Sequence, residues 1–117
     1  MRHRKSKRTL DRTSPQRQRL LRNLAVALIT HEKIRTTDAR AKATRRLVER
    51  LITTGQKKTL AARRQLLRVI PNQTAVNKVI DTLSPRYAQR HGGYSRLTKI
   101  GLRQGDGAQM VVMELIQ

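Results

Sequence analysis

The chain has 117 residues, with 27 Lys or Arg against seven Asp or Glu and a formal net charge of +20. This length suits one domain, and a hydrophobic content of 37% predicts a small core. Cysteine is absent, which excludes disulfides, thiolate zinc sites and cysteine nucleophiles. The longest apolar run, residues 24–29, is far shorter than the roughly 20 residues that cross a bilayer. We therefore expect a partner that is a polyanion, and no membrane.

The first 22 residues are strongly basic, with nine Arg or Lys against one acid, Asp11. Like charges repel and extend such a segment, whereas the phosphates of a nucleic acid neutralise it and release counterions. We interpret residues 1–13 as a basic extended N-terminal arm that becomes ordered on nucleic acid, and residues 14–117 as a single α+β domain. A solvated tail or a localisation signal is the alternative. The other cations, which continue through the chain, favour binding.

The first helix is predicted to begin at Ser14 and Pro15, because Ser14 can accept a free backbone N–H and proline suits the first turn. We expect this helix to reach about Thr30. Apolar residues recur along it at helical spacing, and cations occupy the other side. The apolar stripe consists of Leu20, Leu21, Leu24, Leu28 and Ile29, opposite Arg19, Arg22 and Asn23.

A short strand is predicted over residues 32–36, and Thr37 or Asp38 then caps a second helix that Gly55 ends. One face of this helix is apolar, and cations recur every four residues on the other. Two further helices are expected over residues 60–70 and 74–83. The apolar face carries Thr44, Leu47, Val48, Leu51 and Ile52, and the basic face carries Lys42, Arg46 and Arg50.

The last third of the chain predicts a β-hairpin. Ser84-Pro85 and the glycines at 92–93 are expected to end the helices. Thr98, Ile100 and Leu102 should share one strand face, residues 104–107 form a turn, and residues 108–116 form the second strand. The fold class is therefore α+β, a two-layer domain in the order helix, strand, helix, helix, helix, strand, strand, in which helices cover a small mixed sheet.

Nothing in the sequence predicts catalysis. His31-Glu32 begins a zinc-protease motif, but Arg35 stands where the second histidine is required. The other histidines lie among cations that repel a metal. Gly105 and Gly107 lack the helix that would hold a nucleotide phosphate. We expect no catalytic, cofactor or metal site, and we interpret Glu49, Asp81 and Glu114 as partners of nearby arginines.

Residues 86–96 mix cations, glycines and two tyrosines, a mixture that suits phosphate contact combined with stacking on a base or ribose. A core role is the alternative, more for Tyr87 than for Tyr94. Because the chain has two Tyr and no Phe or Trp, we do not expect a stacking platform for single strands. Recognition should depend mainly on the backbone and shape of a folded RNA.

Three segments resemble one family. They are residues 1–6 (MRHRKS), residues 31–42 (HEKIRTTDARAK) and residues 90–96 (RHGGYSR), the last followed by Gly105, Asp106 and Met110. In combination they resemble the bacterial large-subunit ribosomal protein seventeen family, over essentially the whole chain. The resemblance implies a non-catalytic, cytoplasmic constituent of the 50S subunit near the exit-tunnel side. It also implies one copy per ribosome, with 23S ribosomal RNA and neighbouring subunit proteins as partners.

The same resemblance assigns RNA contacts to the arm, to the strand-to-helix turn and to the loop before the hairpin. Those residues are Arg2, His3, Arg4, Lys5, Lys7 and Arg8 in the arm, Thr36, Thr37, Arg40 and Lys42 in the turn, and Arg90, Gly92, Gly93, Tyr94 and Arg96 in the loop. To these we add cations from the basic segments and faces. They are Arg12, Arg17, Arg19, Arg22, Arg46, Arg86, His91 and Lys99.

Two other functions share some of these features. A DNA-binding nucleoid protein would carry the same charge, although the helices show no helix-turn-helix spacing or dimer element. An RNA-modifying enzyme would need a cofactor loop or an acid/base pair, which the sequence does not offer.

Overall fold

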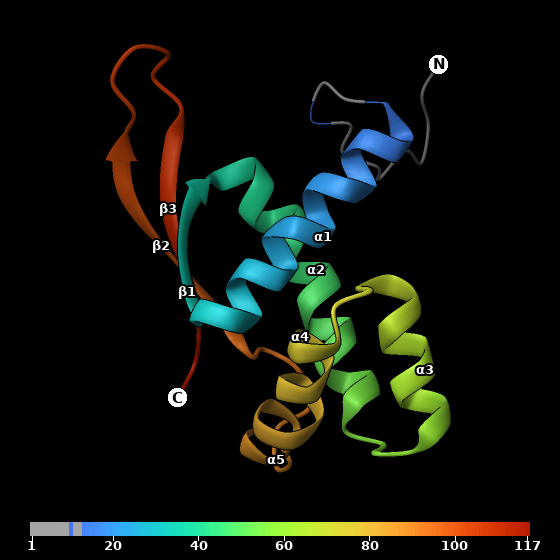
Figure 1. Ribbon diagram of the computed structural model, residues 1–117. Helices are drawn as coiled ribbons and strands as arrows, with labels where there is room; N and C mark the ends of the chain where they lie inside the picture. The colour runs from blue at the N-terminus through green and yellow to red at the C-terminus, as the bar shows by residue number, and fades with distance from the viewer. Residues whose placement is uncertain (1–9, 11–12) are drawn as a thin grey trace, which may run out of the picture.

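The structure, a computed structural model, describes residue 10 and residues 13–117 (Figure 1). The predicted arm lies outside the described residues except for Leu10 and Thr13. The helices and strands follow one another in the predicted order, which confirms the α+β class. The elements are α1 Ser14–His31, β1 Lys33–Thr37, α2 Asp38–Gly55, α3 Leu60–Val69, α4 Gln73–Lys78, the π-helix η1 Val79–Leu83, α5 Ser84–Arg86, β2 Ser95–Leu102 and β3 Gln109–Leu115.

The sheet has the strand order β1-β3-β2, and both strand pairs are antiparallel. The expectation of a mixed sheet is therefore wrong. The tight hairpin makes β3 antiparallel to β2, and β1 then pairs with the free edge of β3 in the same sense. Val111, Met113 and Leu115 of the central strand are buried, whereas the alternate residues Val112 and Glu114 are only partly buried.

Helices α1 and α2 lie against one face of the sheet, and α3 to α5 gather away from it (Figure 1). Helices α3 and α4 pack mainly on α2 and α1, so only the first two helices form the predicted cover. One cluster of buried side chains joins both regions, with Ile29, Ile52 and Leu83 fully buried in it. Among the described residues, no helix has the length and apolarity that a bilayer crossing requires.

The residue that caps helix α1 lies one position before the one expected. Thr13, rather than Ser14, is the N-cap, and its N–H donates to the Gln16 side chain at 3.4 Å. Only the second half of the helix contains buried residues, among them Leu28 and Ile29, whereas Leu20, Leu21 and Leu24 stay partly exposed. The first half extends beyond the sheet (Figure 1), which leaves its cations in solvent.

Ser84-Pro85 does not end the helices, contrary to the prediction. Residues 73–86 form one continuous helical run through α4, η1 and α5. A proline ring normally collides with the preceding turn of an α-helix. Here the preceding turn is a wider π turn, in which the Ser84 N–H donates to the carbonyl of Val79 five residues back. This turn gives the ring of Pro85 room and carries the helix to Arg86.

Gly55 also has a role that the sequence did not indicate. It is the last residue of α2 but does not adopt the left-handed conformation, which Lys58 adopts instead with φ 53°. A Cβ at Gly55 would lie 2.8 Å from Ser84 Oγ and 2.9 Å from Val79 Cγ1. Gly55 is therefore needed for the close approach of α2 and η1.

A β-bulge separates the residues that were expected to share a strand face. The register of β2 against β3 shifts between Lys99 and Gly101, so Ile100 is an extra residue. Thr98 pairs with Val112 and Leu102 pairs with Gln109, which places Thr98 and Leu102 on opposite faces. The prediction of one shared face is wrong, because the bulge reverses the alternation.

The contact at Gly55 yields a stability prediction. Gly55→Ala should lower the free energy of unfolding by about 1–2 kcal/mol, because overpacking against Val79 outweighs the higher helix propensity of alanine. Ser84→Ala should be close to neutral alone, since Ser84 Oγ is buried without a hydrogen-bond partner among the described residues. Combined with Gly55→Ala, it should restore part of the loss. Urea unfolding measures all three variants, and a stabilised Gly55→Ala protein would contradict the packing argument.

Candidate nucleic-acid interface

Ion pairs determine which cations are already occupied. Six pairs join acids to Lys or Arg within the described part of the chain. Glu49 and Glu114 each pair with an arginine, as predicted. Asp81 is exposed and forms no ion pair with any described residue. The pairs are Lys42 with Asp38, Arg45 with Glu49, Lys78 and Arg86 with Glu32, Arg96 with Glu114, and Arg103 with Asp106.

Most of the other predicted cations have no ion pair to a described residue, so a phosphate could approach them without displacing an acid from residues 13–117. They come from α1, from α2 and from the segment that leads into and along β2. This group consists of Arg17, Arg19, Arg22, Arg40, Arg46, Arg90 and Lys99. The predicted arm contacts lie outside the described residues; they are Arg2, His3, Arg4, Lys5, Lys7, Arg8 and Arg12.

Helices α1 and α2 bring three of their cations to one hollow. Arg22, Arg46 and Arg50 line a cavity of about 390 Å³, which Val69 closes from the end of α3. Arg50 was not among the predicted contacts, although it continues the four-residue spacing of Lys42 and Arg46. Three guanidinium groups at one hollow create a local positive potential that suits a phosphate.

The turn between β1 and α2 has mainly structural contacts. Thr37 is the N-cap of α2, and its hydroxyl accepts from the Arg40 N–H at 3.4 Å. Lys42 binds Asp38 in the first turn at 2.9 Å. The Thr36 side chain is buried, which contradicts its prediction as an RNA contact, because its position on β1 faces the helices.

Tyr94 lies in the core, so the prediction that it offers a ring to RNA is wrong. Its side chain is fully buried, and its ring centroid is 5.0 Å from that of Tyr87. The Tyr94 hydroxyl lies 3.2 Å from Thr53 Oγ1 and donates to the Arg90 carbonyl at 3.3 Å. A core this small gains most by burying the two largest apolar side chains that the chain has.

The loop before β2 is nevertheless open to a partner. Gly92 and Gly93 have φ of 105° and 64°, a region that favours glycine, and a Cβ at either would meet nothing within 4 Å. His91 beside them is exposed. The Arg90 guanidinium donates to the Gly93 carbonyl at 3.0 Å, and this bond fixes the conformation of the loop. The exposed loop backbone is therefore accessible for the predicted contact.

The charge of Arg86 is already paired with an acid within the fold. Its guanidinium donates to both carboxylate oxygens of Glu32, the left-handed residue after α1. Lys78 binds the same carboxylate at 3.2 Å and donates to the Thr30 carbonyl at 3.0 Å. The hydrogen bond from Arg86 lowers the pKa of Glu32, although partial burial opposes the shift, and the same bond raises the pKa of Arg86. This cluster fastens the end of α1 to α4 and α5.

The outer face of the sheet carries cations that the sequence analysis missed. Lys33, Glu114 and Arg96 form one cross-strand row, and Arg35 lies in the next row beside Val112. Lys33 and Arg35 are exposed on β1. Their spacing of two on a predicted strand was the signal that could have revealed this basic face.

The fold and these surfaces define a small, strongly basic α+β protein that suits a polyanionic partner. Its sequence matches the family described as Ribosomal protein L17 over residues 20–116. The chain therefore belongs to the ribosomal protein L17 family. This membership confirms the resemblance and makes the chain a ribosomal protein rather than an enzyme.

Individual relatives agree with this assignment. The chain is 50% identical to the large ribosomal subunit protein bL17 of Dehalococcoides mccartyi over the full length of both proteins. It is 48% identical to bL17 of Syntrophotalea carbinolica over 117 residues, which are all of this chain and 76% of that protein. Identity to bL17 of Clostridium botulinum is 44% over 109 residues, 93% of this chain and 96% of that protein.

The Glu32 cluster predicts a pH-dependent stability. Because the pKa of Glu32 is lowered in the folded protein, its carboxylate stabilises the fold at pH values above the ordinary glutamate pKa of about 4.3. This contribution is lost as the pH falls through the lowered pKa of the folded protein. Glu32→Gln should therefore lower the free energy of unfolding by about 1–2 kcal/mol at pH 7 and by progressively less below pH 4.3. Denaturant unfolding at several pH values measures this.

The control is Glu114→Gln, whose partner Arg96 has a side chain 60% exposed, so little loss is expected at any pH. A loss for Glu32→Gln that does not change between pH 7 and pH 3 would show that the carboxylate charge contributes nothing.

Proposed function

We propose that this protein is a structural constituent of the large ribosomal subunit that binds and organises 23S ribosomal RNA. The proposal rests on one observation above all, the family match across residues 20–116 of a chain with a net charge of +20. One copy per subunit, a place near the exit-tunnel side and contacts with neighbouring subunit proteins complete it.

Phosphate and shape recognition is the mode of binding that the described surface supports. Both tyrosines are buried, so residues 13–117 offer no tyrosine ring for base stacking. The accessible chemistry consists of guanidinium, ammonium and amide groups together with open backbone at residues 92–93. Such groups suit phosphates and ribose hydroxyls of folded RNA.

The protein works in this proposal as a scaffold with two parts. Residues 1–13 act as the basic arm and residues 14–117 as the folded domain. The domain holds its cations on rigid helices, including Arg22, Arg46 and Arg50 around one hollow. The arm neutralises phosphates of a different RNA segment. Because each neutralised phosphate reduces repulsion between RNA segments, binding both keeps them close.

The strength of phosphate binding predicts a steep salt dependence. Each neutralised phosphate contributes a slope of about −0.7 to −0.9 to a plot of log affinity against log salt, so six contacts give a slope steeper than about −4. The pair of changes Arg46→Gln and Arg50→Gln should reduce this slope by about 1.5. Filter binding of large-subunit ribosomal RNA at several salt concentrations measures it.

The matched control neutralises the neighbouring ion pair, Arg45→Gln with Glu49→Gln, which leaves the net charge unchanged. Its slope should equal that of the parent protein. A nearly flat parent curve would remove the electrostatic mechanism. Duplex DNA that competed as well as ribosomal RNA would favour a nucleoid role instead.

The arm makes a separate prediction. Six Lys or Arg lie within residues 1–12, and changing all six to Gln in the full chain should reduce the slope by about 4. Circular dichroism checks that the domain keeps its helices. An unchanged slope would show that the arm does not contact phosphate, and the proposal would then depend on the domain alone.

A further inference from the structure

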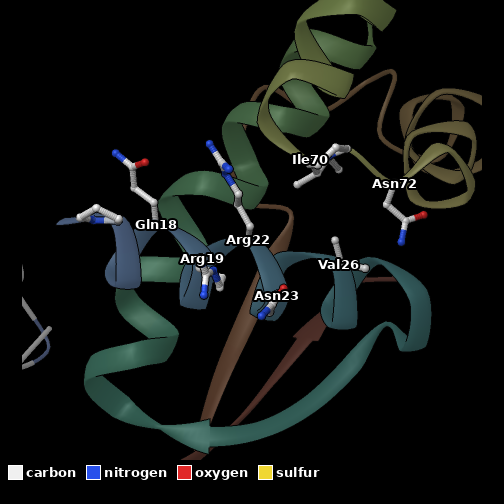
Figure 2. A pocket seen from close by; sticks show the side chains of 9 residues that line it. Gln18, Arg19, Arg22, Asn23, Val26, Ile70 and Asn72 are labelled. Atoms are coloured by element: carbon white, nitrogen blue, oxygen red, sulfur yellow. The ribbon is translucent and has the colours of Figure 1, made fainter. Parts of the chain in front are cut away.

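A hollow of about 510 Å³ lies between α1 and the connection from α3 to α4, and Figure 2 shows the side chains around it. Two rows of side chains at four-residue spacing line it from α1, namely Gln18, Arg22 and Val26, and Pro15, Arg19 and Asn23. Figure 2 shows Val26 directed toward Ile70 and Asn72 across the hollow. We propose that this hollow binds one unstacked nucleotide of the RNA, which rests on the ribosomal-RNA binding proposed above.

The lining combines three kinds of group. Val26 and Pro71 offer apolar surface, whereas Ile70, which also borders the hollow, is fully buried. Side-chain amides are present on both walls, from Gln18 and Asn23 on one and from Asn72 on the other. The cations Arg19 and Arg22 complete it, and among the described residues no acid lines the hollow. A nucleotide has the matching parts: an apolar base face, a base edge of donors and acceptors, and a phosphate.

Asn72 is held in place for such a contact. As the N-cap of α4, its Oδ1 accepts from the Ala75 N–H at 3.0 Å. This bond fixes the orientation of the amide, while the NH₂ group remains able to donate to a base edge. A fixed donor costs less entropy on binding than a free side chain does.

The hollow lies beside the basic cavity described above. Gln18 and Arg22 line both, so they form a ridge between them. A strand that crosses this ridge can place its base in the first hollow and a neighbouring phosphate beside Arg46 and Arg50 in the second. An acidic peptide would use the cations but has no flat base to match the amides and apolar surface.

The nucleotide must come from a loop, a bulge or another unpaired part of the RNA. Bases in an A-form helix are stacked, and their edges are used by pairing or lie in a groove too narrow for side chains. A cavity between a helix and a connection can receive only a base that has left the stack. The α1 hollow therefore adds local recognition of an unpaired base to the general attraction for phosphate.

The first test removes two amides of the hollow without changing the charge of the protein. Gln18→Ala with Asn23→Ala changes two exposed, uncharged side chains. This variant should bind large-subunit ribosomal RNA at least about fivefold more weakly, with an unchanged salt slope. The matched control is Gln65→Ala with Gln104→Ala, also exposed, and its affinity should not change. Unfolding curves check that both variants keep the parent stability.

The outcomes distinguish this inference from the proposed function. Unchanged affinity for Gln18→Ala with Asn23→Ala, with steep salt dependence retained, would overturn the nucleotide site and leave ribosomal-RNA binding intact. A slope that fell with the affinity would overturn base insertion, because it indicates phosphate contact alone. A flat salt dependence of the parent protein would instead overturn the proposed function.

A second test identifies the occupant directly. A photoreactive amino acid at position 23 of the full chain, incorporated into large subunits and irradiated, should form adducts with one or two unpaired nucleotides. Adducts with base-paired nucleotides only, adducts with a neighbouring protein, or no adducts would each overturn the inference.

Discussion

The scarcity of acids is the constraint on which the structure depends. The chain has seven acids and 27 cations, so repulsion between cations opposes folding. The acids offset this repulsion best where they bind cations of two different segments. Glu32 has the most consequential position, because it binds Lys78 and Arg86 and so joins the end of α1 to α4 and α5. The described part of α1 that extends beyond the sheet contains no acid. The same distribution of charge thus stabilises the body and leaves the extended end of α1 open to a polyanion.

The small core has a second consequence for recognition. Tyr87 and Tyr94 pack on each other, and the hydroxyl of Tyr87 donates to the carbonyl of Ile116 after the last strand. These rings hold the helical run against the end of the sheet, so they are not available to stack on bases. The described surface must then recognise RNA without its tyrosines, mainly with cations, amides and open backbone. The hollow beside α1 matters for this reason, since it combines amides with apolar surface.

Local patterns predicted most elements, and the errors come from packing and backbone geometry that those patterns do not show. Helical periodicity and the turn at residues 104–107 depend on near neighbours, and both predictions are confirmed. Pro85 fails as a helix end because a π turn precedes it. Gly55 does end α2 as predicted, but its close packing against η1 was not predicted. Tyr94 fails as a contact because it is buried against Tyr87 and beside Thr53, which lies 41 residues away in sequence.

The candidate site was likewise predictable from the sequence only in part. Charge alone indicated which residues could meet phosphate, but only the fold shows that Arg86 is occupied by Glu32, 54 residues away. Charge also gave no reason to group Arg22 with Arg46, or Val26 with Asn72. Helix α1 connects these observations. Its second half is buried and held by the Glu32 cluster, so its first half is positioned rigidly although little of it is buried. A cation on a rigid helix loses less conformational entropy on binding phosphate than a cation on a flexible chain. The packing of the second half of α1 therefore increases the affinity of the cations on its first half for phosphate.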